Sequence, residues 1–567
     1  MNSPTPSIVA QAAVRRLPRI VLWLFCLAYV MPGFWGRDPW RSDDIAALGY
    51  MLELAGGSAD WFHPKLAGEF PANGGLLPYW LGAWSVMFNQ GVLGHALSDT
   101  WAARLPFVGL LVWTLISVWY GIYNFAQNPR LQPVAFAFGG EANPKDYAQT
   151  LADGGLLAFI ACLGLAQLSH ETTPALVQLS LLAWLFCSFA VLPFKPRLGF
   201  IGVSLGLVAL TLSGAPNMAL ALGFGCAWVL RDQIPVPVRF KVMMGIVATS
   251  TLCYLLGLKW NLVSWDLAPP LSLRQWQDAG SLLFWFTWPA WPMAAWSVWS
   301  WRQPVYSNLC QHPLLLPLVF TGVTVSTTLL TGASDKALLL SLPAWACLAA
   351  MALPTLQRSV SALIDWFTLL FFTCCGFVIW VIWIAIQTGV PQQPAANVAR
   401  LAPDFSTRFE FWPFALALMA TLCWAWLVRW RVGRHRAALW KSMVLPAGGA
   451  ALCWLLLTTL WMPLLNHARS YNPLLQKISN QIHPDRCVQY FGLPLGLIAG
   501  LKFQEQLRIE PASDNASCPW LLVDKEIINE VPGIVNASQW RQVASWGHPR
   551  EGEEDVVLFS KVPHGQH

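Results

Sequence analysis

The chain has 567 residues, of which 56% are hydrophobic and only 11% are charged, and its mean hydropathy is positive. So few charges cannot solvate a globule of this size, which excludes a water-soluble protein and predicts one that crosses a membrane many times. The net charge of +6 does not indicate nucleic-acid binding, because the Lys and Arg residues lie in short clusters between apolar runs and form no basic face.

The first apolar run, Ile20 to Phe34, follows three arginines and is expected to anchor the chain with its N-terminus in the cytoplasm. A signal peptide is the alternative, but the run lacks a small-residue cleavage site. Further runs bring the predicted total to about thirteen spans, an odd number that places the termini on opposite sides. Their centres lie near Leu111, Ile160, Leu185, Val208, Phe224, Ile246, Pro289, Val323, Leu342, Leu370, Leu418 and Leu455.

Basic residues fall in alternate loops between these runs, and the positive-inside tendency assigns those loops to the cytoplasm. The other loops then face outward. Three of them are long: Trp35 to Thr100, Lys259 to Gly280, and Gln387 to Pro413. We expect the functional residues in these outer loops, above all in the first one, residues 35–100.

The chain turns polar after Pro463 and contains alternating apolar stretches, such as Trp520 to Val523 and Asp555 to Phe559. Alternation with a period of two is typical of strands, and a helix-like segment precedes them, so we predict a small mixed α/β domain outside the membrane. The expected division is a transmembrane domain over residues 1–465 and a C-terminal domain over residues 466–567.

Two of the thirteen cysteines, Cys487 and Cys518, lie in this polar region. If the region is extracytoplasmic, an oxidising compartment would allow them to form one disulfide. The other cysteines lie in the membrane portion at irregular spacing, with no CxxC or Cys/His cluster, so they predict no metal site.

The segment after the first run carries two adjacent carboxylates, Asp43 and Asp44, which follow Ser42 at the start of a helical-looking stretch. Ser42 is a suitable N-cap, and the helix dipole favours ionised acids in the first turn, so capping alone would explain these residues. The functional alternative rests on position, because Arg37 and Arg41 flank the pair at the outer membrane surface. There a carboxylate can accept a proton from a hydroxyl while cations stabilise a departing phosphate.

Further along the same loop lies an aromatic-rich, amphipathic stretch suited to the membrane interface. In order, the loop and the start of the second span contain Asp60-Trp61, Pro64, Leu66, Gly68-Glu69, Tyr79-Trp80-Leu81 and Ala103-Arg104-Leu105-Pro106. Together with Asp43-Asp44, this pattern resembles the GT-C glycosyltransferases of the protein O-mannosyltransferase and lipid A aminoarabinose transferase type. The resemblance is specific over residues 37–106 and weaker downstream, where Lys336 precedes the span that contains Pro343.

The resemblance implies a GT-C fold of about thirteen spans with a C-terminal outer domain, and a sugar donor carried on a polyprenyl phosphate such as undecaprenyl phosphate. It also implies that Asp43 is the general base for the acceptor hydroxyl, while a nearby Lys or Arg, with Lys336 as the first candidate, stabilises the leaving phosphate. A single displacement of this kind inverts the anomeric centre. Asp44 would then orient the loop or pair with Arg41. No cofactor and no obligatory metal follow from the chemistry, and the family divides on a divalent metal.

The sequence departs from the family's pattern at two places where relatives usually carry a lysine. Asn73-Gly74-Gly75 replaces an acid, a Lys and a Pro, and Ser213-Gly214-Ala215-Pro216 stands where relatives often have Lys-Gly-Pro. Donor binding must then draw on other cations. Besides Lys336, the candidates for the donor phosphate are Arg41, Lys65, Lys259 and Arg274. The candidates for holding the acceptor or organising the loop are Glu69, Tyr79 and Trp61.

We therefore expect a bacterial inner-membrane transferase with a periplasmic C-terminus, which binds membrane lipids and modifies a lipid, a protein or a cell-envelope glycan such as lipopolysaccharide. A transporter or flippase of lipid-linked glycans is one alternative, but the sequence has no continuous charged path through its spans. A catalytically silent scaffold is another, and the absent lysines would suit it. Donor turnover separates the enzyme from both alternatives, and vesicle uptake identifies a transporter.

Overall fold

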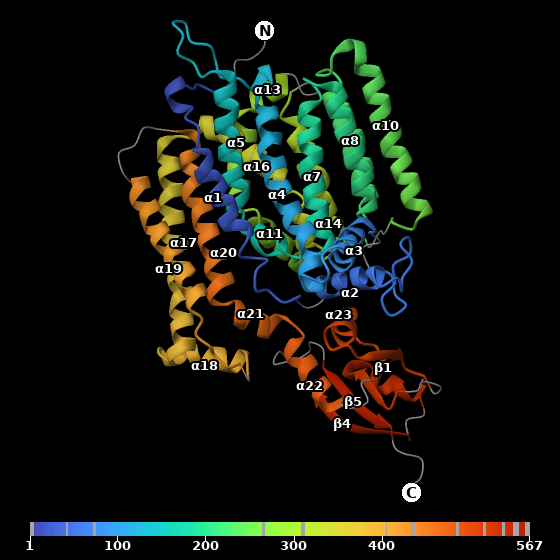
Figure 1. Cartoon of the computed structure of the whole chain (residues 1–567). Coiled ribbons are helices and arrows are strands. Elements are labelled where there is room, and N and C mark those ends of the chain that lie inside the picture. The colour runs from blue at the N-terminus through green and yellow to red at the C-terminus, as the bar shows by residue number, and fades with distance from the viewer. Residues whose placement is uncertain are drawn as a thin grey trace.

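The computed structural model describes residues 5–40, 43–71, 75–263, 267–307, 312–403, 405–432, 438–482, 487–513, 518–533, 535, 539–547 and 555–561. A bundle of helices forms its larger part, and a small domain that contains a β-sheet lies beyond one end of this bundle (Figure 1). The first described residues lie at the opposite end (Figure 1). We call the end that faces the sheet domain the outer end.

Apolar helices form the bundle and confirm a polytopic helical membrane protein. Among the described residues, six helical segments are long and apolar enough to cross a membrane. They comprise α4 (Asp99–Ala126), α7 (Pro174–Val191), α10 (Val236–Lys259), α17 (Arg358–Thr388), most of α19 (Phe411–Val432), and α20 (Val444–Leu460) with the turn before it. Shorter helices of the bundle are α1 (Arg19–Val30), α5 (Pro144–Ala161), α8 (Pro196–Leu212), α9 (Pro216–Leu230), α12 (Ala290–Ser300), α14 (Leu315–Leu330) and α16 (Leu342–Ala352).

Local sequence explains where many of these helices begin and end. Proline is the first residue of α5, α7, α8 and α9. This position suits proline, because the first N–H groups of a helix have no partner within it and the proline ring sets φ near the helical value. At the other end of α17, Gly389 adopts a left-handed conformation with φ of 77° and closes the helix.

The predicted apolar runs coincide with these helices. Every predicted centre falls inside a helix except Pro289, which immediately precedes α12. The run around Pro289 is thus divided between α11 (Leu273–Phe286) and α12, since a proline within one continuous helix would remove a backbone hydrogen bond.

Several short helices lie at the outer end of the bundle (Figure 1). The first outer loop forms α2 (Asp43–Ala55) and the amphipathic α3 (Leu77–Gly91), in which Tyr79 and Val86 are buried while Trp84 and Phe88 are exposed. The helix expected after Asp43 is therefore present, while its expected N-cap, Ser42, lies outside the described residues. The remaining short helices are α6 (Leu165–Leu168), α13 (Arg302–Ser307), α15 (Asp335–Leu339), α18 (Gln392–Leu401), α21 (Met462–Arg469) and α22 (Asn472–Ile482), of which α13 lies at the inner end (Figure 1).

The C-terminal domain is a small mixed α/β unit, as the sequence predicts. Its strands are β1 (Cys487–Phe491), β2 (Arg508–Pro511), β3 (Trp520–Asp524), β4 (Trp540–Trp546) and β5 (Val556–Lys561), in the order β2-β1-β3-β5-β4. β1 pairs in parallel with β2 and β3, whereas β5 pairs antiparallel with β3 and β4. The connection from β1 to β2 contains α23 (Leu495–Ala499), as a parallel pair requires a crossover.

This domain packs against the first outer loop. A Cβ placed on Gly49 of α2 would lie only 2.8 Å from the Cβ of Ala499, so the two helices are in close contact. Glu53, also in α2, forms an ion pair with Lys502. The hydroxyl of Tyr490 donates to the backbone oxygen of Ala67 over 3.1 Å. The outer domain therefore supports the loop that carries the acidic pair.

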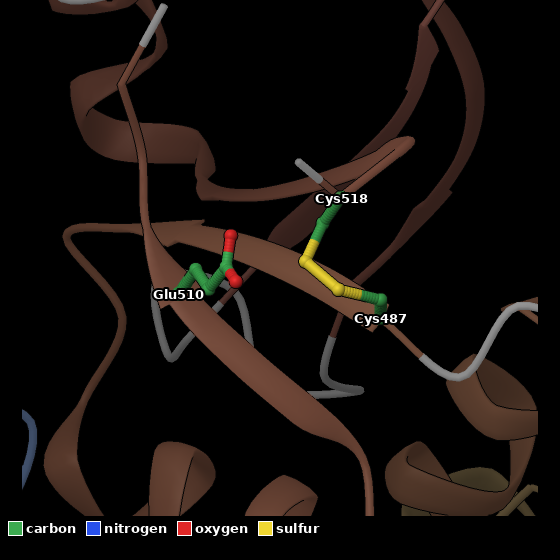
Figure 2. A group of neighbouring side chains, drawn as sticks. All are labelled: Cys487, Glu510 and Cys518. Atoms are coloured by element: carbon green, nitrogen blue, oxygen red, sulfur yellow. A yellow bond between two sulfur atoms is a disulfide. The ribbon is translucent and has the colours of Figure 1, made fainter. Parts of the chain in front are cut away.

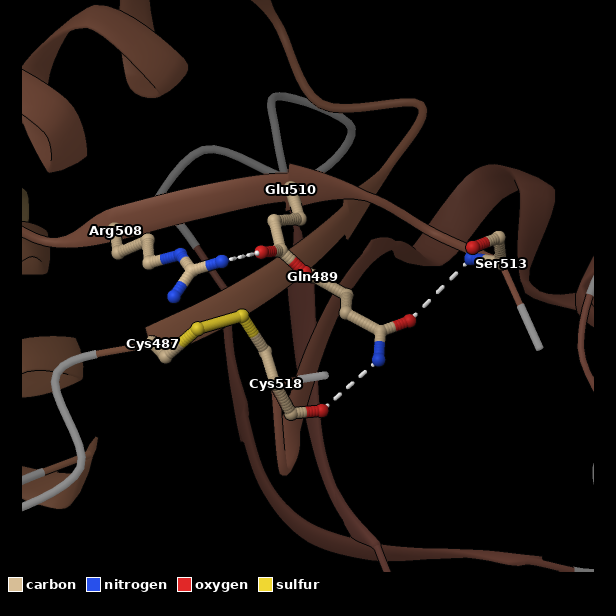
Figure 3. The surroundings of a disulfide bond; sticks show 6 residues. All are labelled: Cys487, Gln489, Arg508, Glu510, Ser513 and Cys518. Atoms are coloured by element: carbon tan, nitrogen blue, oxygen red, sulfur yellow. Dashed lines mark hydrogen bonds and ion pairs between the residues drawn. A yellow bond between two sulfur atoms is a disulfide. The ribbon is translucent and has the colours of Figure 1, made fainter. Parts of the chain in front are cut away.

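A disulfide joins Cys487 in β1 to Cys518 just before β3 (Figure 2). Glu510 lies beside it, and its carboxylate and the two sulfurs are all within 4.8 Å of one another. Because both sulfurs are bonded to each other, neither is available as a thiolate ligand, and the cluster is no metal site. Next to the bond, the side-chain amide of Gln489 donates to the backbone oxygen of Cys518 over 2.9 Å and accepts from the backbone N–H of Ser513 (Figure 3).

Reduction of this disulfide is expected to loosen the outer sheet. The disulfide closes a loop with a sequence separation of 31, for which the chain-entropy model gives about 3–4 kcal/mol of stabilisation. Cys487→Ser should therefore speed hydrogen exchange of the β1 and β3 amides, and so should treatment of the wild type with a reductant. Cys374→Ser is the control, because Cys374 is an exposed free cysteine. Unchanged exchange after reduction would show that the sheet does not depend on the bond.

Candidate active site at the outer end of the bundle

The first acid of the pair, Asp43, lies in direct contact with Lys336. Asp43 is the first residue of α2, and Lys336 belongs to the short helix α15, so the contact joins two loops far apart in the sequence. The side chain of Asp43 is 46% exposed and that of Lys336 is 35% exposed. Partial burial lowers the pKa of Lys336 from its ordinary value, whereas the adjoining carboxylate favours the charged form. A base and a cation thus lie together where a ligand can reach both.

The second acid, Asp44, has a different environment, because its side chain is buried. One carboxylate oxygen accepts from Arg37 over 3.3 Å and from the backbone N–H of Trp40 over 3.2 Å. The other accepts from the backbone N–H and the hydroxyl of Thr172 over 2.9 and 2.5 Å. Burial alone would raise the pKa of Asp44, but the charges of Arg37 and Arg104 and the Thr172 hydrogen bonds outweigh it and lower the pKa. Asp44 therefore ties the start of α2 to the bundle.

Arg37 links this carboxylate to neighbouring segments. Its guanidinium donates to the backbone oxygen of His170 over 2.9 Å and lies 3.5 Å from the carboxylate of Glu171. Arg104, from the Arg-Leu-Pro motif of the second span, donates to the backbone oxygen of Arg37. We expected Asp44 to orient the loop or to pair with Arg41. Its cationic partner in the described structure is Arg37, and Arg41 lies outside the described residues.

The segment before the acidic pair is held from the far end of the chain. Asn466 in α21 accepts from the backbone N–H of Asp38 over 3.2 Å and from the indole N–H of Trp40 over 3.1 Å. Its side-chain amide donates to the backbone oxygen of Gly36 over 2.9 Å. Asn472 adds a hydrogen bond of 2.7 Å to the carboxylate of Asp38. Sequence reasoning did not identify either asparagine, since they lie more than 400 residues from the segment they hold.

The other candidate cations lie apart from the acidic pair. Lys65 is exposed and lies over the ring of Phe70, with the ammonium 4.8 Å from its centroid. Lys259 ends α10 and Arg274 lies in the first turn of α11, both exposed. Within the described part of the chain, Lys336 is thus the one candidate cation in contact with Asp43.

The three residues expected to hold the acceptor or to organise the loop contact other residues of the first outer loop. Tyr79 is buried against Tyr50, with ring centroids 5.2 Å apart. The backbone oxygen of Trp61 accepts from the indole N–H of Trp80 over 2.8 Å. Glu69 exposes its side chain, while its backbone oxygen accepts from the hydroxyl of Tyr50 over 3.2 Å.

Gly75, the described residue of the first departure from the resemblance, lies next to Ser213 of the second. The backbone N–H of Leu76 donates to Leu212 over 2.7 Å. A Cβ placed on Gly75 would lie 2.7 Å from the backbone oxygen of Ser213, so this close approach requires glycine. Asn73 and Gly74 lie outside the described residues.

The helical bundle and the small sheet domain beyond its end together define a polytopic membrane protein with a C-terminal mixed α/β domain. No protein-family model and no curated protein matches the sequence. Among solved structures, ArnT from Cupriavidus metallidurans bound to undecaprenyl phosphate matches with a TM-score of 0.56 and 12% identity, over 97% of this chain and 100% of that one. Its apo form matches with a TM-score of 0.55 and 13% identity, over 95% and 98%. The Archaeoglobus fulgidus oligosaccharyltransferase gives a TM-score of 0.43 and 10% identity, over 89% and 69%. The chain thus has an ArnT-like GT-C fold.

Proposed function

We propose that the chain is a membrane glycosyltransferase that transfers a sugar from a polyprenyl phosphate to an acceptor at the outer face of the membrane. The observation that supports this most directly is the contact between Asp43 and Lys336 at the outer end of an ArnT-like fold. A general base beside a cation is what such a reaction needs, since a proton leaves the acceptor while negative charge develops on a phosphate.

In the proposed reaction, the acceptor hydroxyl attacks the anomeric carbon while the bond from that carbon to the phosphate oxygen breaks. Asp43 takes the hydroxyl proton, and Lys336 stabilises the polyprenyl phosphate that leaves with the electron pair. A single displacement inverts the anomeric centre, and no step needs a metal or other cofactor. In this proposal the donor phosphate takes the place of the Asp43 carboxylate at the Lys336 ammonium, which frees Asp43 to act as a base.

The surrounding residues act as positioning groups in this proposal. Asp44 and Arg37 hold the start of α2, and Asn466 holds the segment before it, so that Asp43 faces α15. Arg41, Lys65, Lys259 and Arg274 remain proposed contacts of the donor phosphate, and Glu69, Tyr79 and Trp61 remain proposed contacts of the acceptor or organisers of the loop.

Topology and cellular place form part of the same proposal. We propose thirteen spans, a transmembrane domain over residues 1–465 and an outer domain over residues 466–567. In a bacterial inner membrane, this topology would place the N-terminus in the cytoplasm and the C-terminus in the periplasm. The undecaprenyl phosphate of the matched ArnT structure supports a polyprenyl phosphate ligand. The acceptor is a lipid, a cell-envelope glycan or a protein hydroxyl.

The proposal is tested by mass spectrometry of lipids and surface glycans from cells that lack the chain. We expect a sugar-sized mass difference that is restored by the intact protein and not by Asp43→Asn. The mass difference would also identify the sugar and the acceptor. Absence of any difference in all fractions would argue against transfer and favour a scaffold or a transporter.

Loss of the Asn466 hydrogen bonds is expected to slow transfer without removing donor binding. Asn466→Leu removes all three bonds to residues 36–40 and should lower kcat about tenfold, because Asp43 would be less well oriented. A tenfold effect corresponds to a loss of about 1.4 kcal/mol of transition-state stabilisation. The KM for the donor should change little, since Lys336 is untouched. A rise in KM with unchanged kcat would contradict a positioning role.

A further inference from the structure

A pocket separate from the Asp43 site lies at the outer ends of α17, α19 and α20. It is partly open to the surroundings. The last turns of α17 and α20 and the first turn of α19 form its walls, together with the start of α21. None of the residues that line it takes part in the contacts of Asp43, Asp44 or Lys336.

Three aromatic side chains line the pocket and pack against other rings. Trp383 of α17 stacks against Phe414 of α19, with ring centroids 5.6 Å apart. Phe405 packs against the ring of His467 in α21 at 5.4 Å, and this imidazole lies 3.1 Å from the backbone oxygen of Pro403. These contacts hold the segment before α19 over the pocket, so the cavity is bounded by four elements and not by a single loop.

Two opposite charges also line this largely apolar pocket. Arg408 and Glu410 both line it, and both precede the first residue of α19, which places them beyond the end of the apolar span. Both side chains are exposed, and neither forms an ion pair with another described residue. The pocket thus combines apolar walls with one cation and one anion. These two charged residues are two positions apart in the sequence and precede the apolar span.

We propose that this pocket binds a phospholipid whose head group carries a phosphate and a primary ammonium, of the phosphatidylethanolamine type. Such a lipid presents an apolar chain, a phosphate and a cation in succession, which matches the aromatic walls, Arg408 and Glu410. The guanidinium fork suits a phosphate, and the carboxylate suits an ammonium that can donate hydrogen bonds. A choline head group lacks N–H donors, and a glycerol head group lacks the positive charge, so both match the charge pair less well.

The test compares three lipids with identical acyl chains on the purified full-length protein. Native mass spectrometry in mild detergent would measure bound phosphatidylethanolamine, phosphatidylcholine and phosphatidylglycerol. We expect phosphatidylethanolamine to bind about tenfold more tightly than the other two, because only its head group offers both a phosphate and N–H donors on a positive charge. Equal binding of phosphatidylethanolamine and phosphatidylcholine would overturn the proposal, and preference for phosphatidylglycerol would indicate a site for anionic lipids instead.

Substitutions of Arg408 and Glu410 test whether the lipid binds at this pocket. Arg408→Gln and Glu410→Gln should each weaken phosphatidylethanolamine binding about tenfold, and Glu410→Gln should also remove the preference over phosphatidylcholine. Arg400→Gln is the matched control, because Arg400 is an exposed arginine of α18 that does not line the pocket. Equal loss in this control would contradict a specific site. The comparison of lipids on the unaltered chain remains decisive if a variant folds poorly.

Discussion

Replacing Asp43 with asparagine is expected to lower sugar transfer by about 10²- to 10⁴-fold while leaving the fold intact. Asparagine has the size of aspartate but cannot take up the acceptor proton at neutral pH. The side chain of Asp43 is 46% exposed, so little packing is lost. Transfer is measured as sugar-bearing product formed by membranes that contain equal amounts of either protein, and folding as thermal unfolding in detergent.

Binding of undecaprenyl phosphate separates the roles of Asp43 and Lys336. Asp43→Asn should keep or tighten this binding, because it removes the carboxylate that competes for the ammonium. Lys336→Gln should weaken it, because the ammonium is the expected phosphate contact. If Asp43→Asn transferred sugar at the wild-type rate, the base would lie elsewhere, and the exposed Glu69 of the same loop would be tested next.

Replacing Asp44 with asparagine is expected to lower the stability of the fold. Asp44→Asn would remove the carboxylate shared by the buried guanidinium groups of Arg37 and Arg104, leaving Arg37 with Glu171 alone. Loss of one partner from a buried charge pair costs about 3–5 kcal/mol. We expect a clear fall in the thermal unfolding temperature for Asp44→Asn and a much smaller one for Asp43→Asn. The two variants make the same chemical change, so each is the control for the other.

The pH dependence of this effect follows from the lowered pKa of Asp44. A carboxyl with a lower pKa in the folded state stabilises the fold above its ordinary pKa, and this contribution disappears as the pH falls through the lowered value. The difference in stability between wild type and Asp44→Asn should be constant from about pH 5 to 8 and shrink below about pH 4. A constant difference into acid would mean that the effect of Asp44→Asn does not arise from the charge.

The Arg37→Gln/Asp44→Asn double variant tests the pair itself. Since Arg37 and Asp44 are direct partners, the double variant should be less destabilised than the sum of the single variants. Additive losses would assign the stability of this region to the Thr172 hydrogen bonds instead.

Much of the architecture could be predicted from the sequence, because it depends on local composition. Long apolar runs must form helices in a membrane, since no water is present to satisfy their backbone groups. The predicted run centres accordingly fall in or next to helices, and the alternating stretches at Trp520 and Asp555 correspond to β3 and β5. The acidic pair was found by its position after the first span, and α2 begins at Asp43.

The different surroundings of Asp43 and Asp44 were decided by tertiary structure alone. Two adjacent carboxylates look equivalent in a sequence, but successive positions on a helix point in different directions. One faces Lys336 of α15, and the other faces Arg37 and Thr172. The partners of each lie in loops between other spans, and contacts of such long sequence separation have no local signal in the chain.

By itself, the sequence determined the helical membrane class, the small mixed outer domain and the location of the acidic loop, because burial of apolar runs and period-two alternation are properties of neighbouring residues. Only the tertiary structure decided which cation meets Asp43, that Asn466 holds the segment before it, and that Arg408 and Glu410 share an aromatic pocket. These arrangements depend on how the bundle brings distant loops to one end, which is set by packing of the whole chain.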